Sequence, residues 1–236
     1  MARRLRVALV TRSLITGGAH QQIVKLCQSI SPEVVELSLF LLTRDEANEL
    51  RPGLPRHARV HTSPLRRHHP RVLKWLAGGI RRERAQVAHS FQWHADATAA
   101  LSRVLFGWGP LVISERCDRG GPSYRRQAGL RHLMDRWATF PASQWTCANS
   151  QFGQRLLVQL GVPPNPTTCT LNGVDCARFD AVLALSIRDH HSWPSGCAVV
   201  GAVCRLVAYK GADGSLADLC WSGAHPVCSS GTYRGV

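Results

Sequence analysis

Two basic side chains near the end of the chain, Arg205 and Lys210, are of the types that bind phosphate groups. Arginine offers a planar fork of N–H donors to two phosphate oxygens, whereas lysine offers a compact point charge. Gly17 and Gly18 stand between an apolar run and a helical pattern, so N–H groups at a helix N-terminus could also bind a phosphate. The alternatives are a solvated basic loop for the first pair and a flexible turn for the second. The three-glycine dinucleotide fingerprint is absent from the sequence, so no nicotinamide cofactor is expected.

Four further candidates lie near the ends of two apolar runs: His89 within the run 87–91 and His94 after it, and Glu115 and Arg116 after the run 111–114. The carboxyl ends of parallel strands form the edge at which α/β sheets bind ligands. Imidazole and charged groups at that edge could hydrogen-bond the hydroxyls of a substrate. The alternatives are a structural histidine with satisfied hydrogen bonds and an ion-pair network involving Glu115 and Arg116.

The elements that must position these residues alternate between two patterns. Continuous apolar runs, typical of strands buried on both faces, predict seven strands at 7–11, 34–42, 58–61, 87–91, 111–114, 145–148 and 168–171. Apolar residues at helical spacing predict helices within 23–30, 72–80, 95–105, 130–137 and 152–160. Gly161 is the expected C-cap of the last helix. The alternation predicts an α/β fold with a doubly wound parallel sheet.

Composition narrows the classes of protein. A length of 236 residues can bury a sizeable core, and a net charge of +14 favours anionic partners such as nucleotide phosphates or anionic lipid. A solvated basic face is the alternative meaning of that charge. The nine cysteines include no Cys-x-x-Cys pair, so we expect neither a zinc site nor a disulfide framework. The sequence predicts reduced thiols, no signal peptide, no membrane span and a cytoplasmic location.

Several short motifs together resemble the family 4 glycosyltransferases. The most specific pieces occur in order and cover roughly residues 7 to 211: Gly17-Gly18-Ala19, Ser114-Glu115-Arg116, Asn149-Ser150-Gln151, Leu160-Gly161-Val162-Pro163, Leu171-Asn172-Gly173-Val174-Asp175, and Gly201 with Arg205-Leu206 and Lys210-Gly211. The resemblance implies the N-terminal half of a GT-B fold, with a Rossmann-like acceptor-side domain over 1–180. It further implies an interdomain linker over 181–196 and the start of a donor-binding domain, with an aberrant tail, over 197–236.

The resemblance also implies an activity and roles for residues. Members transfer a sugar from a nucleotide-sugar donor to an acceptor, with retention of configuration and without a required metal or other cofactor. By this resemblance Arg205 and Lys210 contact the donor diphosphate, together with Gly17 and Gly18. His89, His94, Glu115 and Arg116 lie on the acceptor side. His89, Arg205 and Lys210 are then the expected catalytic residues, and the acceptor is a glycan or a lipid-linked molecule of the cell envelope or surface.

The family's pair of donor-binding glutamates has no counterpart, because Glu115 is the last glutamate of the sequence. We therefore expect the donor half to be largely missing and the activity of this chain alone to be weak or absent. A peripheral contact with the anionic inner face of a membrane stays open. The competing hypothesis is a non-catalytic basic module that binds nucleic acid or anionic lipid. The basic residues of such a module would be those within 66–84, where Trp75 is the one aromatic side chain. Bases therefore have little to stack on, and no specific nucleic-acid recognition is expected.

Overall fold

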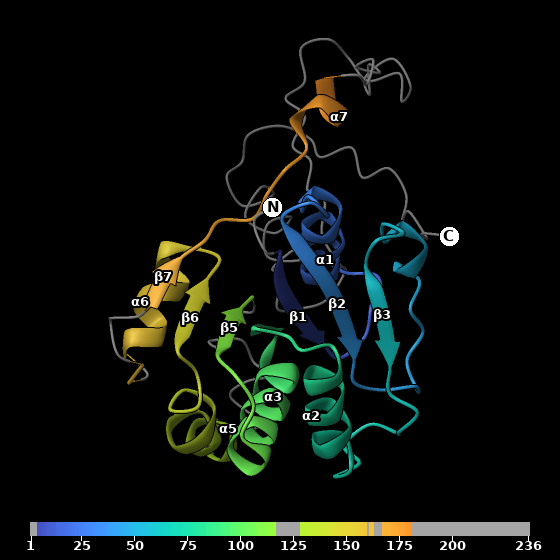
Figure 1. The fold of residues 1–236 in the computed structure, drawn as a ribbon. Coiled ribbons are helices and arrows are strands. Elements are labelled where there is room, and N and C mark those ends of the chain that lie inside the picture. Colours follow the sequence, from blue (N-terminus) through green and yellow to red (C-terminus); the bar gives the residue numbers. More distant parts are fainter. Residues whose placement is uncertain (1–3, 117–127, 160, 163–166, 181–236) are drawn as a thin grey trace, which may run out of the picture. The chain divides into compact units, whose positions relative to one another are not determined.

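The computed structural model describes residues 4–116, 128–159, 161–162 and 167–180. Its centre is a seven-stranded, all-parallel sheet (Figure 1). The strands are β1 (Leu5–Thr11), β2 (Val35–Leu41), β3 (Arg59–Thr62), β4 (Val87–Phe91), β5 (Leu111–Glu115), β6 (Trp145–Ala148) and β7 (Thr167–Cys169). The helices are α1 (Gly18–Ser29), the short 3₁₀ turn η1 (Arg51–Gly53), α2 (Val72–Arg82), α3 (Trp93–Phe106), α5 (Ala128–Met134), its π-helical continuation η2 (Asp135–Thr139), α6 (Gln151–Gln159) and α7 (Cys176–Asp180).

The order of the strands, β3-β2-β1-β4-β5-β6-β7, makes the sheet doubly wound. The chain begins at β1 in the middle, runs outward to β3, and returns through α2 to β4 on the other side of β1. The direction of winding therefore reverses between β1 and β4. In open α/β sheets a ligand binds outside the carboxyl ends of the strands at such a switch point.

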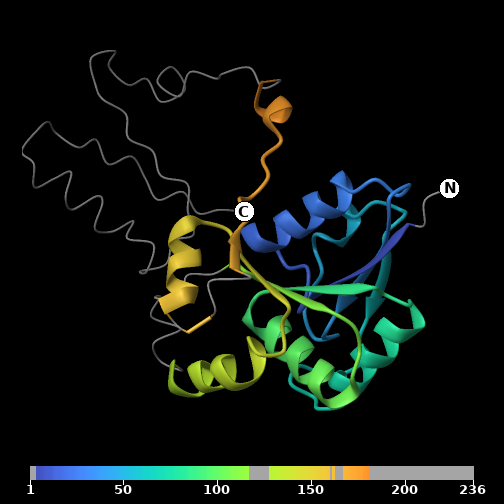
Figure 2. The ribbon, with the colours of Figure 1, turned by 60° about the vertical axis from the view of Figure 1, so that its left-hand side comes forward.

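Two layers of apolar side chains explain why the strands read as continuous apolar runs. Alternate residues of β1 point to opposite faces: Ala8 and Val10 pack with α2 and α3, whereas Leu9 packs with α1. Figures 1 and 2 show α2 and α3 side by side on one side of the sheet and α1 on the other. Gly79 lets α2 approach closely, because a Cβ at that position would overlap the ring of the fully buried Phe40.

The predicted fold class is confirmed. All seven predicted strands are present, with ends that differ by no more than two residues, and every predicted helical stretch falls on a helix. Gly161 adopts a left-handed conformation (φ 90°) after α6, as expected of a C-cap. The helix predicted within 130–137 spans the end of α5 and the start of η2, whose π-helical form was not predicted, and the short α7 was not predicted.

By its contacts the chain divides into two compact units, residues 1–175 and 176–236. The first holds the whole sheet, and of the second only α7 is described. The predicted linker over 181–196 and the donor-domain start over 197–236 lie outside the described residues, as do Arg205 and Lys210. None of the described helices is both long and apolar enough to cross a bilayer. The four described cysteines, Cys27, Cys147, Cys169 and Cys176, are all free thiols.

Candidate functional site

The carboxyl edge of the sheet brings together the ends of β4 and β5 and the segment that follows β7. His89 lies in β4, and its Nε2 is 2.9 Å from Oγ of Ser114 in β5. Arg116 donates from Nη2 to the same hydroxyl at 3.4 Å and from Nη1 to Oδ1 of Asn172 at 2.7 Å. Four polar residues from three elements thus form one chain of hydrogen bonds, which we call the His89 network: His89, Ser114, Arg116 and Asn172.

The ring of Phe91 packs against two members of this network. Phe91, which is buried, stacks on the imidazole of His89 with ring centroids 4.3 Å apart. The guanidinium of Arg116 lies 5.6 Å from the centroid of the same ring. Strand register explains the grouping, because Phe91 pairs with Ser114 and their side chains share the face that α1 covers. The ring therefore holds both polar groups in place at the edge.

Burial and charge keep His89 neutral. Burial, and next the positive charge of Arg116, lower the pKa of His89 to about 4. Burial also lowers the pKa of Arg116, whose Nε has no hydrogen-bond partner among the described residues. Because arginine only donates, Ser114 Oγ accepts from Arg116, and its own hydrogen can point at a neutral His89. Such an arrangement is suited to sugar hydroxyls, which donate and accept hydrogen bonds at once.

Glu115 is separated from the residues beside it in sequence. Side chains alternate along a strand, so Ser114 and Arg116 point to one face of the sheet and Glu115 to the other. Glu115 is buried. The expected acceptor-side group of Glu115 and Arg116 is thus divided between the two faces.

The two glycines of the sequence motif lie at the start of α1. Gly17 is the N-cap in an extended conformation (φ 168°), and Gly18 is the first helical residue. No side chain caps the helix, and a Cβ at Gly18 would meet nothing within 4 Å. Backbone conformation therefore does not require glycine here. The glycines leave the end of α1 uncovered within the described part of the chain.

His94 lies apart from the His89 network, in the first turn of α3. Its Nε2 is 3.5 Å from Nη2 of Arg67, and its ring centroid is 5.4 Å from that of His68. The guanidinium of Arg131 lies 4.5 Å from the ring centroid of Trp93, the neighbour of His94. Burial lowers the pKa of His94 to about 4, with further lowering by Arg12, Arg67, His68 and Arg131. We call His94, Arg67, His68 and Arg131 the His94 cluster.

Two residues at the switch point were not among the predicted site residues. His20 of α1 is only 5% exposed, and within the described part of the chain its Nε2 has no hydrogen-bond partner. Burial and Arg12 lower the pKa of His20, against smaller opposing effects of Gln92 and Glu46. Gln92, the N-cap of α3, has φ 74° and ψ 150°, a region that side-chain-bearing residues rarely adopt. A histidine beside a glycine pair was the available sequence signal for His20, whereas nothing in the sequence marks the backbone of Gln92.

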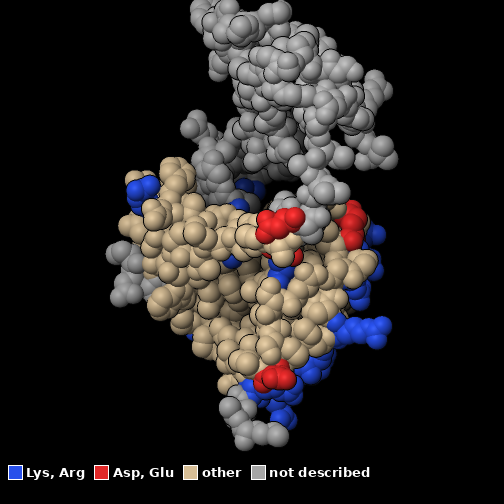
Figure 3. Space-filling view, turned by 90° about the horizontal axis from the view of Figure 1, so that it is seen from above, with Lys and Arg blue, Asp and Glu red and all other residues tan. Residues whose placement is uncertain are grey.

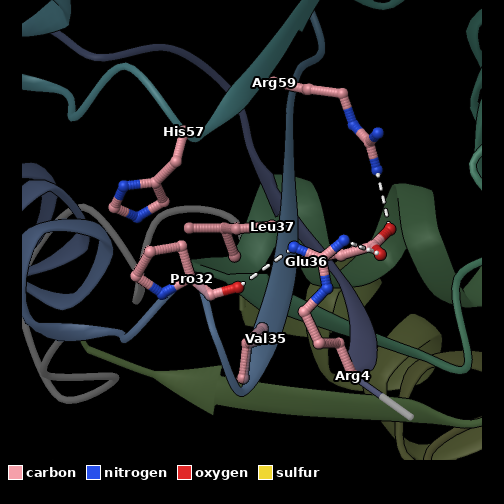
Figure 4. Close-up of a pocket in the computed structure, with 7 residues that line it drawn as sticks. All are labelled: Arg4, Pro32, Val35, Glu36, Leu37, His57 and Arg59. Atoms are coloured by element: carbon pink, nitrogen blue, oxygen red, sulfur yellow. Dashed lines mark hydrogen bonds and ion pairs between the residues drawn. The ribbon is translucent and has the colours of Figure 1, made fainter. Parts of the chain in front are cut away.

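A pocket at the opposite, amino edge of the sheet is a weaker candidate (Figure 4). It has a volume of about 270 Å³ and is lined by Arg4, Pro32, Val35, Glu36, Leu37, His57 and Arg59. Glu36 forms ion pairs with both arginines, at 2.8 Å from Arg4 and 3.5 Å from Arg59. These charges are already neutralised, so the pocket offers little to a charged ligand.

No metal site stands out in the described part of the chain, and the face shown in Figure 3 has no broad basic surface. Its histidine, cysteine and acidic residues form no group of three that could hold a metal ion. On the face shown in Figure 3, Lys and Arg side chains gather along one rim, and the middle of the face is mostly uncharged.

Comparisons with known proteins point to one family and one fold. The model of Glycosyltransferase Family 4 matches residues 16–178. A glycosyltransferase from Rickettsia africae aligns with a TM-score of 0.63 at 14% identity, covering 89% of this chain and 55% of that one. Sucrose-phosphate synthase from Thermosynechococcus elongatus gives a TM-score of 0.58 at 13% identity, covering 82% and 54%. HepE from Anabaena, in complex with UDP-glucose, gives 0.55 at 18% identity, covering 74% and 45%.

At these identities the likeness to solved structures establishes the fold alone. This chain spans about half the length of those proteins. No curated protein sequence matches it significantly.

Proposed function

The chain belongs to glycosyltransferase family 4, and from that premise we propose that it serves sugar transfer from a nucleotide-sugar donor to a glycan or lipid-linked acceptor. The observation that carries this proposal is the His89 network, which gathers Ser114, Arg116 and Asn172 at the carboxyl edge. In family members this domain holds the acceptor. The network lies on β4 and β5, beside the switch point between β1 and β4, and open α/β sheets bind ligands at such a point.

His89 and Arg116 have complementary tasks in this proposal. The neutral imidazole of His89 hydrogen-bonds a hydroxyl of the acceptor sugar and orients it towards the donor, and the fully buried hydroxyl of Ser114 holds the imidazole. Arg116 holds Ser114 and Asn172 and supplies a positive charge near the leaving diphosphate. Positioning of this kind accounts for much of the rate in bimolecular transfer. Glu115, buried on the other face, acts through the packing of β5 rather than by contact.

The donor contacts of the proposal are Arg205, Lys210 and the uncovered end of α1 at Gly17 and Gly18. Arginine and lysine neutralise a diphosphate leaving group directly, so the transfer, with retention of configuration, requires no metal. HepE, in its complex with UDP-glucose, supports a nucleotide sugar as the donor. The net charge of +14 supports a cytoplasmic protein that contacts the anionic face of a membrane peripherally.

Binding of nucleotide sugars to the full chain tests this function. A panel of UDP-, GDP- and ADP-linked sugars is added to the protein, and binding is followed by saturation-transfer NMR. We expect one member to bind, and the double variant Arg205→Gln with Lys210→Gln to weaken that binding by about 10-fold or more, because charged hydrogen bonds are lost. Arg234→Gln is the matched control in the same part of the sequence. If no member of the panel binds, the proposal is wrong.

A further inference from the structure

The His94 cluster places two arginines, Arg67 and Arg131, around a neutral imidazole at the start of a helix. Its members come from three separate parts of the chain: Arg67 and His68 from the segment before α2, His94 from α3, and Arg131 from α5. The Arg67 guanidinium lies 3.5 Å from the His94 ring nitrogen, and the His68 ring is 5.4 Å away from the His94 ring. Arg67 and Arg131 both lower the pKa of His94, so two positive charges act on the same ring, and an anion bound between them would relieve their repulsion.

The described residues provide no such anion for Arg67 or Arg131, since neither has an ion-pair partner there. Nearby carboxylates have other hydrogen bonds: Asp45 accepts the backbone N–H of Arg67 at 2.9 Å, and Asp135 accepts the indole N–H of Trp93 at 3.1 Å. Glu46 is paired with Arg12 at 3.0 Å. The Arg131 guanidinium rests on the Trp93 ring, and its buried Nε has no hydrogen-bond partner.

The same position has an uncapped helix end. No side chain caps α3, whose N-cap is Gln92 and which runs for 14 residues. The first N–H groups of a helix of this length carry a partial positive charge that favours an anion. Two arginine side chains, one from the segment before α2 and one from α5, therefore lie near the first turn of α3.

We propose that the His94 cluster binds a phosphate group of the acceptor while the His89 network binds the acceptor's sugar hydroxyls. This inference rests on the proposed function, and it narrows the acceptor to a phosphorylated molecule. A tetrahedral phosphate has oxygens that point in separate directions, which suits donors from a loop, from α3 and from α5. A planar carboxylate would satisfy fewer of them.

Binding has a spectroscopic signature at His94. Surrounding cations and burial hold the pKa of His94 at about 4, so the ring is neutral near pH 7. A bound phosphate adds negative charge beside the ring and raises that pKa. The charged and titratable groups that act on His94 are Arg12, Arg67, His68 and Arg131, and the Trp93 ring lies edge-on to its ring.

The test is an NMR titration of the histidine ring resonances of the full chain with inorganic phosphate. We expect the His94 resonances to shift saturably and its pKa to rise by about one unit or more. Arg67→Gln and Arg131→Gln should each raise the Kd for phosphate by about 10-fold, because each removes a charged hydrogen bond. Arg131→Lys keeps the charge and should recover part of the affinity. Arg82→Gln, at the exposed end of α2, is the control.

Two vesicle arms distinguish the source of the phosphate. Phosphatidylcholine vesicles with and without phosphatidylglycerol are compared with the inorganic ion. A His94 shift with anionic vesicles that exceeds the shift with the ion supports a lipid-borne phosphate, and the reverse supports a soluble one. Absence of a His94 shift with either probe overturns the inference, as does unchanged phosphate affinity in Arg67→Gln and Arg131→Gln. Nucleotide-sugar binding through Arg205 and Lys210 is measured separately, so the proposed function can survive this failure.

Discussion

Several arginines at the two edges of the parallel sheet differ in the groups that contact them. At the amino edge Arg4 and Arg59 are held by Glu36, Arg59 also pairs with Glu83 at 3.0 Å, and His61 lies 3.3 Å from Glu83. At the carboxyl edge Arg12 and Arg44 also pair with carboxylates, of Glu46 and Asp45, but Arg116 binds a hydroxyl and an amide, and Arg131 rests on an aromatic ring. Carboxylates neutralise the arginines of the amino edge. The neutral partners of Arg116 and Arg131 leave those two arginines able to attract an anion.

The difference separates arginines that support the fold from arginines that are available to a ligand. A guanidinium already paired with a carboxylate must lose that partner before it binds an anion, which offsets most of the gain. One held by neutral groups is positioned without being neutralised. The pocket at the amino edge therefore has the weaker claim to function, and the carboxyl edge has the stronger one.

The largest expected effect is at Arg116. Arg116→Gln should lower kcat/KM for sugar transfer by about 100-fold, since two charged hydrogen bonds of roughly 1.5 kcal/mol each position the His89 network. Arg59→Gln is the matched change at the amino edge and should alter kcat/KM by less than about twofold. Steady-state kinetics on both variants checks the contrast. Equal losses in the two variants would remove the distinction between the edges.

Acid should destabilise the carboxyl edge through His89. Its pKa is about 4 in the fold and 6.5 when unperturbed, so the unfolded chain binds the extra proton between these values. The free energy of unfolding is therefore unaffected by this group above about pH 6.5 and falls as pH drops towards 4, by about 2 kcal/mol after allowance for solvent screening. His89→Gln should flatten this fall in urea denaturation measured across that range. His94 and His20, whose pKa values are also lowered, should keep part of the slope.

A smaller effect is expected from the backbone of Gln92. Its φ of 74° and ψ of 150° cost a residue with a Cβ about 1–3 kcal/mol. Gln92→Gly should raise the free energy of unfolding by about 1 kcal/mol, after the greater freedom of glycine in the unfolded chain is subtracted. Gln92→Ala keeps the Cβ and should give no such gain. Thermal unfolding of the two variants separates backbone strain from loss of the amide.

The smallest effect is expected at the amino edge itself. Glu36→Gln removes two partly exposed ion pairs and should cost less than about 1 kcal/mol of stability, because Arg59 keeps Glu83. Nucleotide-sugar binding should not change. If phosphate instead begins to bind at Arg4 and Arg59 in this variant, the explanation by charge compensation is strengthened. A loss of sugar binding would contradict it.

Much of the fold was predictable because burial on both faces leaves a continuous apolar run wherever a strand lies. His89 and Arg116 were predictable for the related reason that they end such runs. Their partnership was not, since the bond from Arg116 to Asn172 joins residues 56 positions apart. The His94 cluster escaped prediction in the same way, because Arg67 and Arg131 approach His94 only in the folded chain. The placement of Glu115 on the other face follows from strand alternation and could have been predicted.

An amide chemical-shift map of the full chain tests the central claim most directly. The nucleotide sugar that binds in the panel is added first, followed by inorganic phosphate. Our account predicts shifts at the carboxyl edge, around Gly18, His89, His94 and Arg116, with little change at Arg4, Glu36 and Arg59. Shifts concentrated at the amino-edge pocket, with the carboxyl edge unchanged, would contradict it.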